Sequence, residues 1–151
     1  MAVKCHICFQ KTKEEYACHV CNANLKDESE KILLSYVGSF SLAETGKGTD
    51  GTLVLTNKRL VGLVDRTNVL SWIVLFLFGW LASAIADIFT KKKLSFSIPL
   101  EELDVSNFEE CKLGLITKGF TVQKTTGGVV RLDVQPPAEW QSVLVEAKSR
   151  L

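Results

Sequence analysis

Alternating apolar and polar positions along residues 31–135 predict a series of short β-strands. In LSFSIPL, the side chains of Leu94, Phe96 and Ile98 lie on one face, because successive residues of a strand point to opposite faces. GTLVLTNKRLVGLVD holds two strands that turn at Thr56–Lys58. Further strands are predicted in KILLSYVGSFSL, DVSNFEECKL, GFTVQKT and VVRLDVQ, which makes seven in all.

After residues 136–137, both proline, the apolar period changes to that of a helix. In AEWQSVLVEAKSRL, apolar residues recur at i, i+3, i+4 and i+7, namely Trp140, Val143, Leu144 and Ala147. Pro137 suits the first turn of a helix, where its missing N–H has no partner to lose. Seven antiparallel strands and one C-terminal helix therefore predict a mainly β fold, a barrel or sandwich closed by the helix.

The stretch from Leu70 to Phe89, LSWIVLFLFGWLASAIADIF, interrupts the strand pattern because it has no polar face. Its one charge is Asp87, and twenty helical residues reach about 30 Å, the thickness of a bilayer's hydrocarbon core. A membrane span here would separate strands of one sheet, so neither half could cover its apolar face. We therefore expect an apolar helix or helical hairpin, inserted at residues 69–90 between the third and fourth strands, with a single-pass span as the alternative.

Two features of this insert indicate what covers it. Small residues at i, i+4 and i+7 allow a second helix to approach closely. Bulky aromatic residues followed by three lysines favour an anionic membrane surface. Membrane contact and homodimer formation are therefore both open interpretations. The residues expected to make the contact are Trp72, Phe76, Phe78, Gly79, Trp80, Ser83, Ala86, Lys91, Lys92 and Lys93.

The N-terminal segment CHICFQKTKEEYACHVC carries two Cys-x2-Cys pairs, the residue pattern of a tetrahedral zinc site. We expect one structural Zn²⁺ per chain, with no open position for catalysis. His6 and His19 lie within the two turns and are alternative ligands, although four cysteines already complete the set. The expected metal ligands are Cys5, Cys8, Cys18 and Cys21.

This segment resembles the zinc-ribbon or zinc-knuckle heads of bacterial proteins. Phe9 and Asn22 stand where glycine often follows the second cysteine in those heads. Asparagine tolerates a left-handed backbone conformation, whereas phenylalanine does so poorly. The sequence therefore predicts that the first turn departs from the usual knuckle geometry.

Composition and charge narrow the function further. A chain of 151 residues suits one domain with a small appendage, and a net charge of +1 argues against a dedicated nucleic-acid binder. Lys4, Lys11 and Lys13 leave a nucleic-acid-binding head as a minor alternative. Both histidines lie in the head, so the rest of the chain has no histidine for catalysis, and we expect no enzyme. MAVKCHICFQ lacks an apolar signal region, which favours the cytoplasm or the inner face of the cytoplasmic membrane.

The run GTLVLTNKRLVGLVD is similar to the G-x-L-x-L-T-x-x-R-L signature of GRAM and related bacterial pleckstrin-homology domains. IPLEELDVSNFE is similar to the strand and turn that follow it. The resemblance implies a seven-stranded sheet closed by a helix, acting as a lipid- or protein-binding module. The predicted organisation is a zinc-ribbon head at residues 1–25 and a GRAM-like domain at residues 30–151.

The expected function is that of a non-enzymatic, zinc-binding adaptor. Its partners are an anionic membrane surface, a protein or a second copy, with no small-molecule substrate. A specific phosphoinositide site is not expected, because the loop SLAETGKGTDG offers one lysine beside two acidic residues. Lys58 and Arg59 are interpreted as solvated turn residues, with contact to an anionic surface as the alternative. The alternative is a soluble scaffold or regulatory protein with no lipid role.

Overall fold

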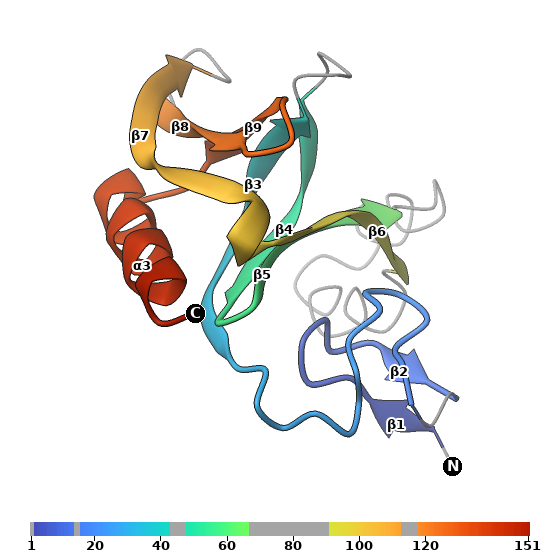
Figure 1. Cartoon of the computed structure of the whole chain (residues 1–151). Helices are drawn as coiled ribbons and strands as arrows, with labels where there is room; N and C mark the ends of the chain where they lie inside the picture. The colour runs from blue at the N-terminus through green and yellow to red at the C-terminus, as the bar shows by residue number, and fades with distance from the viewer. Residues whose placement is uncertain (1, 14–15, 43–47, 67–90, 113–117) are drawn as a thin grey trace, which may run out of the picture.

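The computed structural model describes residues 2–13, 16–42, 48–66, 91–112 and 118–151, and these form a mainly β protein with one C-terminal helix (Figure 1). The small N-terminal sheet consists of β1 (Val3–Lys4) and β2 (Lys11–Thr12). The large sheet consists of β3 (Ile32–Leu42), β4 (Thr49–Thr56), β5 (Arg59–Arg66), β6 (Lys91–Pro99), β7 (Leu103–Lys112), β8 (Lys118–Lys124) and β9 (Val129–Asp133). The helix is α3 (Pro137–Ser149). The seven strands and the helix confirm the prediction from apolar periodicity.

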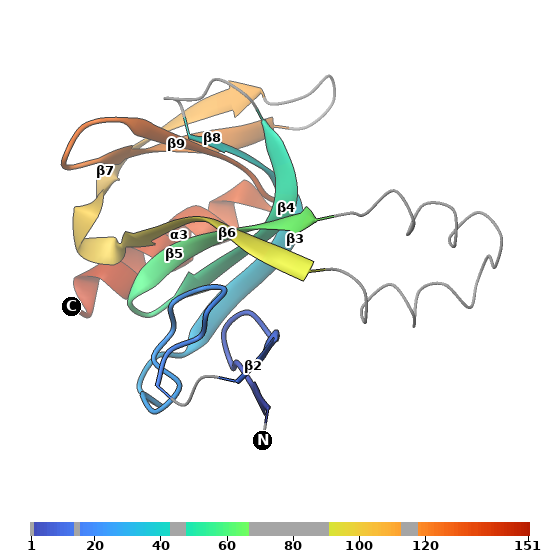
Figure 2. The ribbon, with the colours of Figure 1, turned by 90° about the vertical axis from the view of Figure 1, so that its right-hand side faces the viewer.

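The large sheet is antiparallel throughout, with the strand order β6-β5-β4-β3-β9-β8-β7. Its two end strands, β6 and β7, follow one another in the chain and are joined by the 3₁₀ turn η2 (Leu100–Glu102). A sheet whose opposite ends are joined by so short a turn must curve strongly, as Figure 2 shows. The Leu100 N–H donates to the Lys58 carbonyl at 2.9 Å, and the Thr125 N–H donates to the Glu102 carbonyl at 2.8 Å.

The curved sheet and α3 enclose one large apolar core. Leu53 and Leu55 of β4 point into it, as their alternation predicts, and the rings of Phe40 and Phe96 meet edge to face at 5.3 Å between centroids. The helix closes the core with the face predicted from its spacing, of which Trp140, Leu144 and Ala147 are buried and Val143 is half-buried.

The β4–β5 hairpin is apolar on its outer face as well. Val54 and Val61 pair across the two strands and point away from the main core, yet both are buried, as is Leu63. They form a second apolar cluster with the N-terminal cysteine segment. The sequence analysis predicted the two strands and their turn but made no prediction about burial of the outer face. The near-continuous apolar run was a sign that both faces are covered.

Strand β6 begins at Lys91, three residues before the predicted strand. Arg66 at the end of β5 pairs with Lys91, and the neighbouring pair joins Asp65 to Lys92. The lysines predicted to follow the insert are therefore part of an edge strand. The Nζ atom of Lys92 donates to Thr52 Oγ1 at 3.0 Å.

The insert itself, with the expected contacts Trp72, Phe76, Phe78, Gly79, Trp80, Ser83 and Ala86, lies outside the described residues. Within the described ranges, no helix is both long enough and apolar enough to cross a membrane.

Truncation of the core side of α3 tests the enclosed core. Trp140→Ala removes a buried indole and is expected to lower the free energy of unfolding by about 3–5 kcal/mol. Val145→Ala, at an exposed position of the same helix, should change it by less than about 0.5 kcal/mol. Urea denaturation followed by circular dichroism measures both, and equal effects would contradict this placement of the helix.

Candidate metal centre

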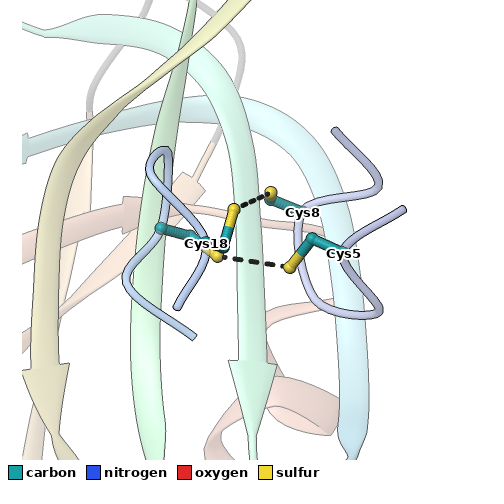
Figure 3. A group of neighbouring side chains, drawn as sticks. Cys5, Cys8 and Cys18 are labelled. Atoms are coloured by element: carbon teal, nitrogen blue, oxygen red, sulfur yellow. Dashed lines mark hydrogen bonds between the residues drawn. The ribbon is translucent and has the colours of Figure 1, made fainter. Parts of the chain in front are cut away.

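Each Cys-x2-Cys pair lies in a turn closed by two backbone hydrogen bonds. In the first turn, the Phe9 N–H donates to the Cys5 carbonyl at 3.0 Å, and the Cys5 N–H donates to the Gln10 carbonyl at 2.9 Å. The second turn repeats both bonds, each at 2.8 Å, with Cys18, Asn22 and Ala23. The two turns therefore present their cysteines in the same way, facing one another (Figure 3).

Phe9 does not distort the first turn, contrary to the sequence prediction. Phe9 has φ 58° and Asn22 has φ 56°, so both turns close through a residue in the left-handed region. The Phe9 side chain is 54% exposed. The first knuckle thus adopts the same conformation as the second, with a residue type that disfavours it.

The four cysteine sulfurs gather in one buried group. The Sγ atoms of Cys5, Cys8, Cys18 and Cys21 all lie within 4.8 Å of one another. The Cys5–Cys21 distance is 3.6 Å and the Cys8–Cys18 distance is 3.5 Å. Zn–S bonds of about 2.3 Å in a tetrahedron place sulfurs about 3.8 Å apart, whereas a disulfide holds them at about 2.05 Å. The group fits a tetrahedral metal ion such as zinc, and none of the four cysteines forms a disulfide.

Neither histidine joins this group in the structure. The Nδ1 atom of His19 lies 3.1 Å from Thr12 Oγ1, in a hydrogen bond that ties the second turn to β2. The Nε2 atom of His6 is buried and has no hydrogen-bond partner among the described residues. The cysteines supply the ligand set without either imidazole.

Burial and mutual hydrogen bonds shift the pKa values of Cys5, Cys8 and Cys21 in different directions. Burial raises the pKa of Cys5 to about 11. The hydrogen bond between Cys8 and Cys21 lowers the pKa of Cys21 to about 5 and raises the pKa of Cys8. Metal binding requires thiolates, so it displaces the protons that Cys5 and Cys8 hold at neutral pH. The apparent metal affinity therefore rises as the pH rises.

The cysteine head packs directly on the outer face of the large sheet. Ile7 and the four cysteines are fully or almost fully buried and share a cluster with Val54, Val61 and Leu63. Leu94 of β6 is half-buried against the same cluster. The head and the outer face of the sheet therefore bury this second apolar cluster between them.

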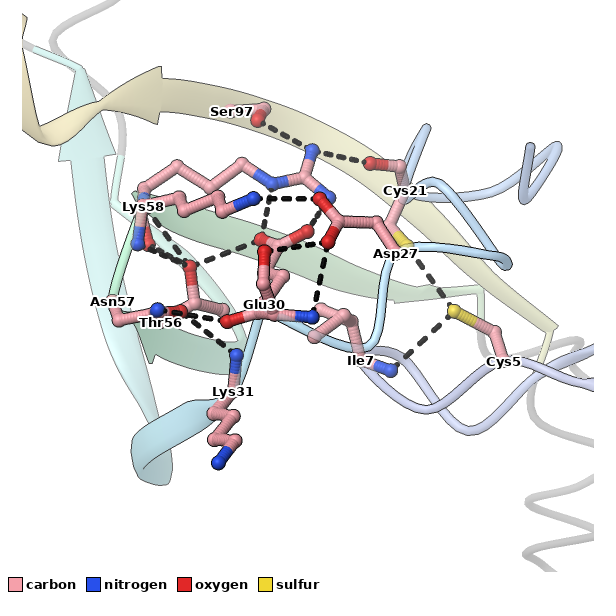
Figure 4. A network of polar contacts seen from close by, with 12 residues as sticks. Cys5, Ile7, Cys21, Asp27, Glu30, Lys31, Thr56, Asn57, Lys58 and Ser97 are labelled. Carbon is pink, nitrogen blue, oxygen red and sulfur yellow. Dashed lines mark hydrogen bonds and ion pairs between the residues drawn. The ribbon is translucent and has the colours of Figure 1, made fainter. Parts of the chain in front are cut away.

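A buried ion pair fastens the head at its second turn (Figure 4). Arg59 donates from Nε to Glu30 Oε1 at 2.7 Å and from Nη2 to Oε2 at 3.2 Å. Its Nη1 atom donates to the Cys21 carbonyl at 2.8 Å and to Ser97 Oγ at 3.1 Å. Thr56 Oγ1 also donates to Glu30, at 3.0 Å. From its position on β5, the Arg59 guanidinium thus links the Cys21 turn of the head, Glu30 in the segment that precedes β3, and Ser97 of β6.

The prediction that Arg59 is a solvated turn residue is wrong. Its side chain is 14% exposed, and that of Glu30 is 6% exposed. The turn does place Arg59 at the surface of the sheet, but the folded head covers that surface. Its neighbour Lys58 is exposed and pairs with Asp27 at 2.6 Å.

The structure thus brings together the four predicted ligands and places Lys92 and Lys93 on edge strand β6. No protein-family model matches the chain, and no curated protein matches it either.

Removal of two ligands tests the metal site. We expect one zinc per chain by elemental analysis, and loss of that zinc in Cys8→Ser with Cys21→Ser, because two remaining thiolates cannot complete the tetrahedron. Cys111→Ser is the matched control, since Cys111 lies on β7 away from the group and should leave the zinc content unchanged. A zinc-free parent, or retention of zinc by the double variant, would contradict this assignment.

Substitution at the buried ion pair tests the joint between head and sheet. Arg59→Ala should lower the free energy of unfolding of the zinc-loaded protein by about 3–5 kcal/mol, because it leaves the Glu30 carboxylate buried without its partner. Arg59→Met with Glu30→Leu should be less destabilising than either single change, since neither charge is stranded. Lys58→Ala is the exposed control and should leave the denaturation midpoint nearly unchanged. If the double change lowers the free energy of unfolding more than either single change, the ion pair does not fix the head on the sheet.

Proposed function

We propose that the chain is a binding module and not an enzyme, made of a zinc-stapled head on a GRAM-like or pleckstrin-homology-like sheet. The seven antiparallel strands closed by a C-terminal helix support the fold that the GRAM-like signature implies. The four-sulfur site supports a structural role for the metal, because it leaves no ligand position for a substrate.

The pairing of Arg66 with Lys91 carries the functional proposal. These residues flank the apolar segment and are neighbours across β5 and β6, so the segment leaves and returns at one end of the sheet (Figure 2). A chain that enters a bilayer from this point also leaves it on the same side. The pairing therefore favours a segment that touches or dips into a membrane over one that spans it once.

The composition of residues 70–89 makes a cover necessary. Burying one Leu, Ile or Phe side chain gains roughly 1.5–3 kcal/mol, so exposing many of them in water would exceed the usual stability of a domain. The cover that we propose is an anionic membrane surface, with Lys92 and Lys93 close to the start of β6. Apolar contact and basic residues together give the two interactions that a stable peripheral attachment needs.

A second copy of the chain is the other candidate cover. Gly79, Ser83 and Ala86 share one stripe of the predicted helix, a pattern that allows two helices to pack closely. This arrangement would bury the same segment in a soluble dimer, so the oligomeric state separates the two proposals.

Vesicle flotation beside light scattering tests the proposed function. Phe76→Asp with Phe78→Asp should release the protein from anionic vesicles, because charges oppose entry into the apolar region. Val37→Asp, at an exposed apolar position of β3, is the matched control and should still float. Gly79→Leu should leave flotation intact if the segment contacts lipid. If the segment works by self-association, Gly79→Leu should instead break the dimer. A parent that is monomeric without detergent and ignores vesicles would refute both covers.

A further inference from the structure

The small sheet β1–β2 and the turn that joins its two strands each carry a residue choice that is unfavourable for stability. Lys4 and Lys11 pair directly across the two strands, and both side chains are exposed. Like charges at directly opposite positions of a sheet repel one another and lower its stability. A short sheet of this kind would be more stable with one charge replaced.

The second unfavourable feature adjoins the first. Phe9 holds φ 58°, a conformation that bulky side chains avoid, and its ring is 54% exposed, so burial does not compensate. The Lys4 Nζ atom lies over this ring, 5.5 Å from its centre, in a cation–π contact that offsets part of this cost. The equivalent position of the second turn holds Asn22, which suits the conformation. Lys4, Phe9 and Lys11 thus form one exposed group, called here the head patch.

Both features become favourable when the head patch meets an apolar surface that carries negative charge. The two ammonium groups then pair with anions, and the ring leaves water. We propose that the head patch docks on an anionic lipid surface, with Phe9 in the interfacial layer and Lys4 and Lys11 on lipid phosphates. This contact goes beyond the proposed function, which assigns membrane contact to residues 70–89, and it uses described residues alone.

The chemistry of the head patch favours lipid over nucleic acid. Its single ring belongs to phenylalanine, which has no polar group, and the neighbouring Val3 is 47% exposed. Sites for single-stranded nucleic acid combine several stacking rings with a basic groove along the backbone.

Flotation of the zinc-loaded full chain tests this contact with vesicles of phosphatidylcholine alone or with added phosphatidylserine. Lys4→Gln and Lys11→Gln should each weaken binding to the anionic vesicles about fivefold, and added salt should weaken the parent in the same way. Lys26→Gln is the control within the head, since Lys26 lies over the Tyr16 ring and outside the head patch. Equal binding by the parent and the two lysine variants would overturn the proposal.

Phe9→Gly gives two readouts with opposite signs. Glycine adopts φ 58° without strain, so thermal stability of the zinc-loaded protein should stay equal or rise, while vesicle binding falls. A merely structural role for Phe9 predicts lower stability with unchanged binding, and that result would overturn the proposal.

The variants also separate the head patch from residues 70–89. In the Phe76→Asp, Phe78→Asp background, the binding that remains should be sensitive to salt and should be lost with Lys4→Gln and Lys11→Gln. If Phe76→Asp with Phe78→Asp has no effect while the lysine changes do, the proposed function fails and the head patch stands. A single-stranded oligonucleotide could also bind the head patch. If it displaces the parent from vesicles, and Lys4→Gln and Lys11→Gln abolish its binding, the lipid assignment is overturned.

Discussion

The β4–β5 hairpin is apolar on both faces, and the rest of the structure follows from the need to cover each of them. The inner face is covered by the curved sheet and α3. The outer face, with Val54, Val61 and Leu63, is covered by the cysteine head. Burying each of these side chains gains roughly 1.5–3 kcal/mol relative to exposure, which is large beside the usual margin of 5–15 kcal/mol. Metal that stabilises the head therefore also stabilises the sheet.

The Arg59–Glu30 pair fixes the orientation of the head on the sheet, which apolar contact alone does not fix. Apolar surfaces pack in many orientations, whereas a bidentate guanidinium that also reaches the Cys21 carbonyl fits one. A buried ion pair adds little net stability over apolar residues of the same size, but an arrangement that leaves either charge unpaired is costly. The pair thus acts chiefly by excluding other positions of the head.

Local pattern predicted most of the strands, the helix and the group of four cysteines, because period-two alternation, turn residues and Cys-x2-Cys spacing are all short-range signals. It failed where a distant segment supplies the environment. Arg59 has the sequence context of a solvated turn, and only the folded head buries it. The predicted strand began at Leu94, and only the pairing of residues 91–93 with β5 extends it back to Lys91. Phe9 shows another limit of prediction from local sequence, because it adopts a left-handed backbone conformation that phenylalanine disfavours.

The cysteine head precedes, along the chain, the strands on which it packs. Cys21 receives its hydrogen bond from Arg59, which follows 38 residues later, and the cover on β6 comes later still. Both cysteine turns therefore precede, along the chain, every strand that covers them. In the folded protein the docked head buries all four sulfurs. A metal ion that enters the completed chain must therefore wait for the contact between head and sheet to open locally.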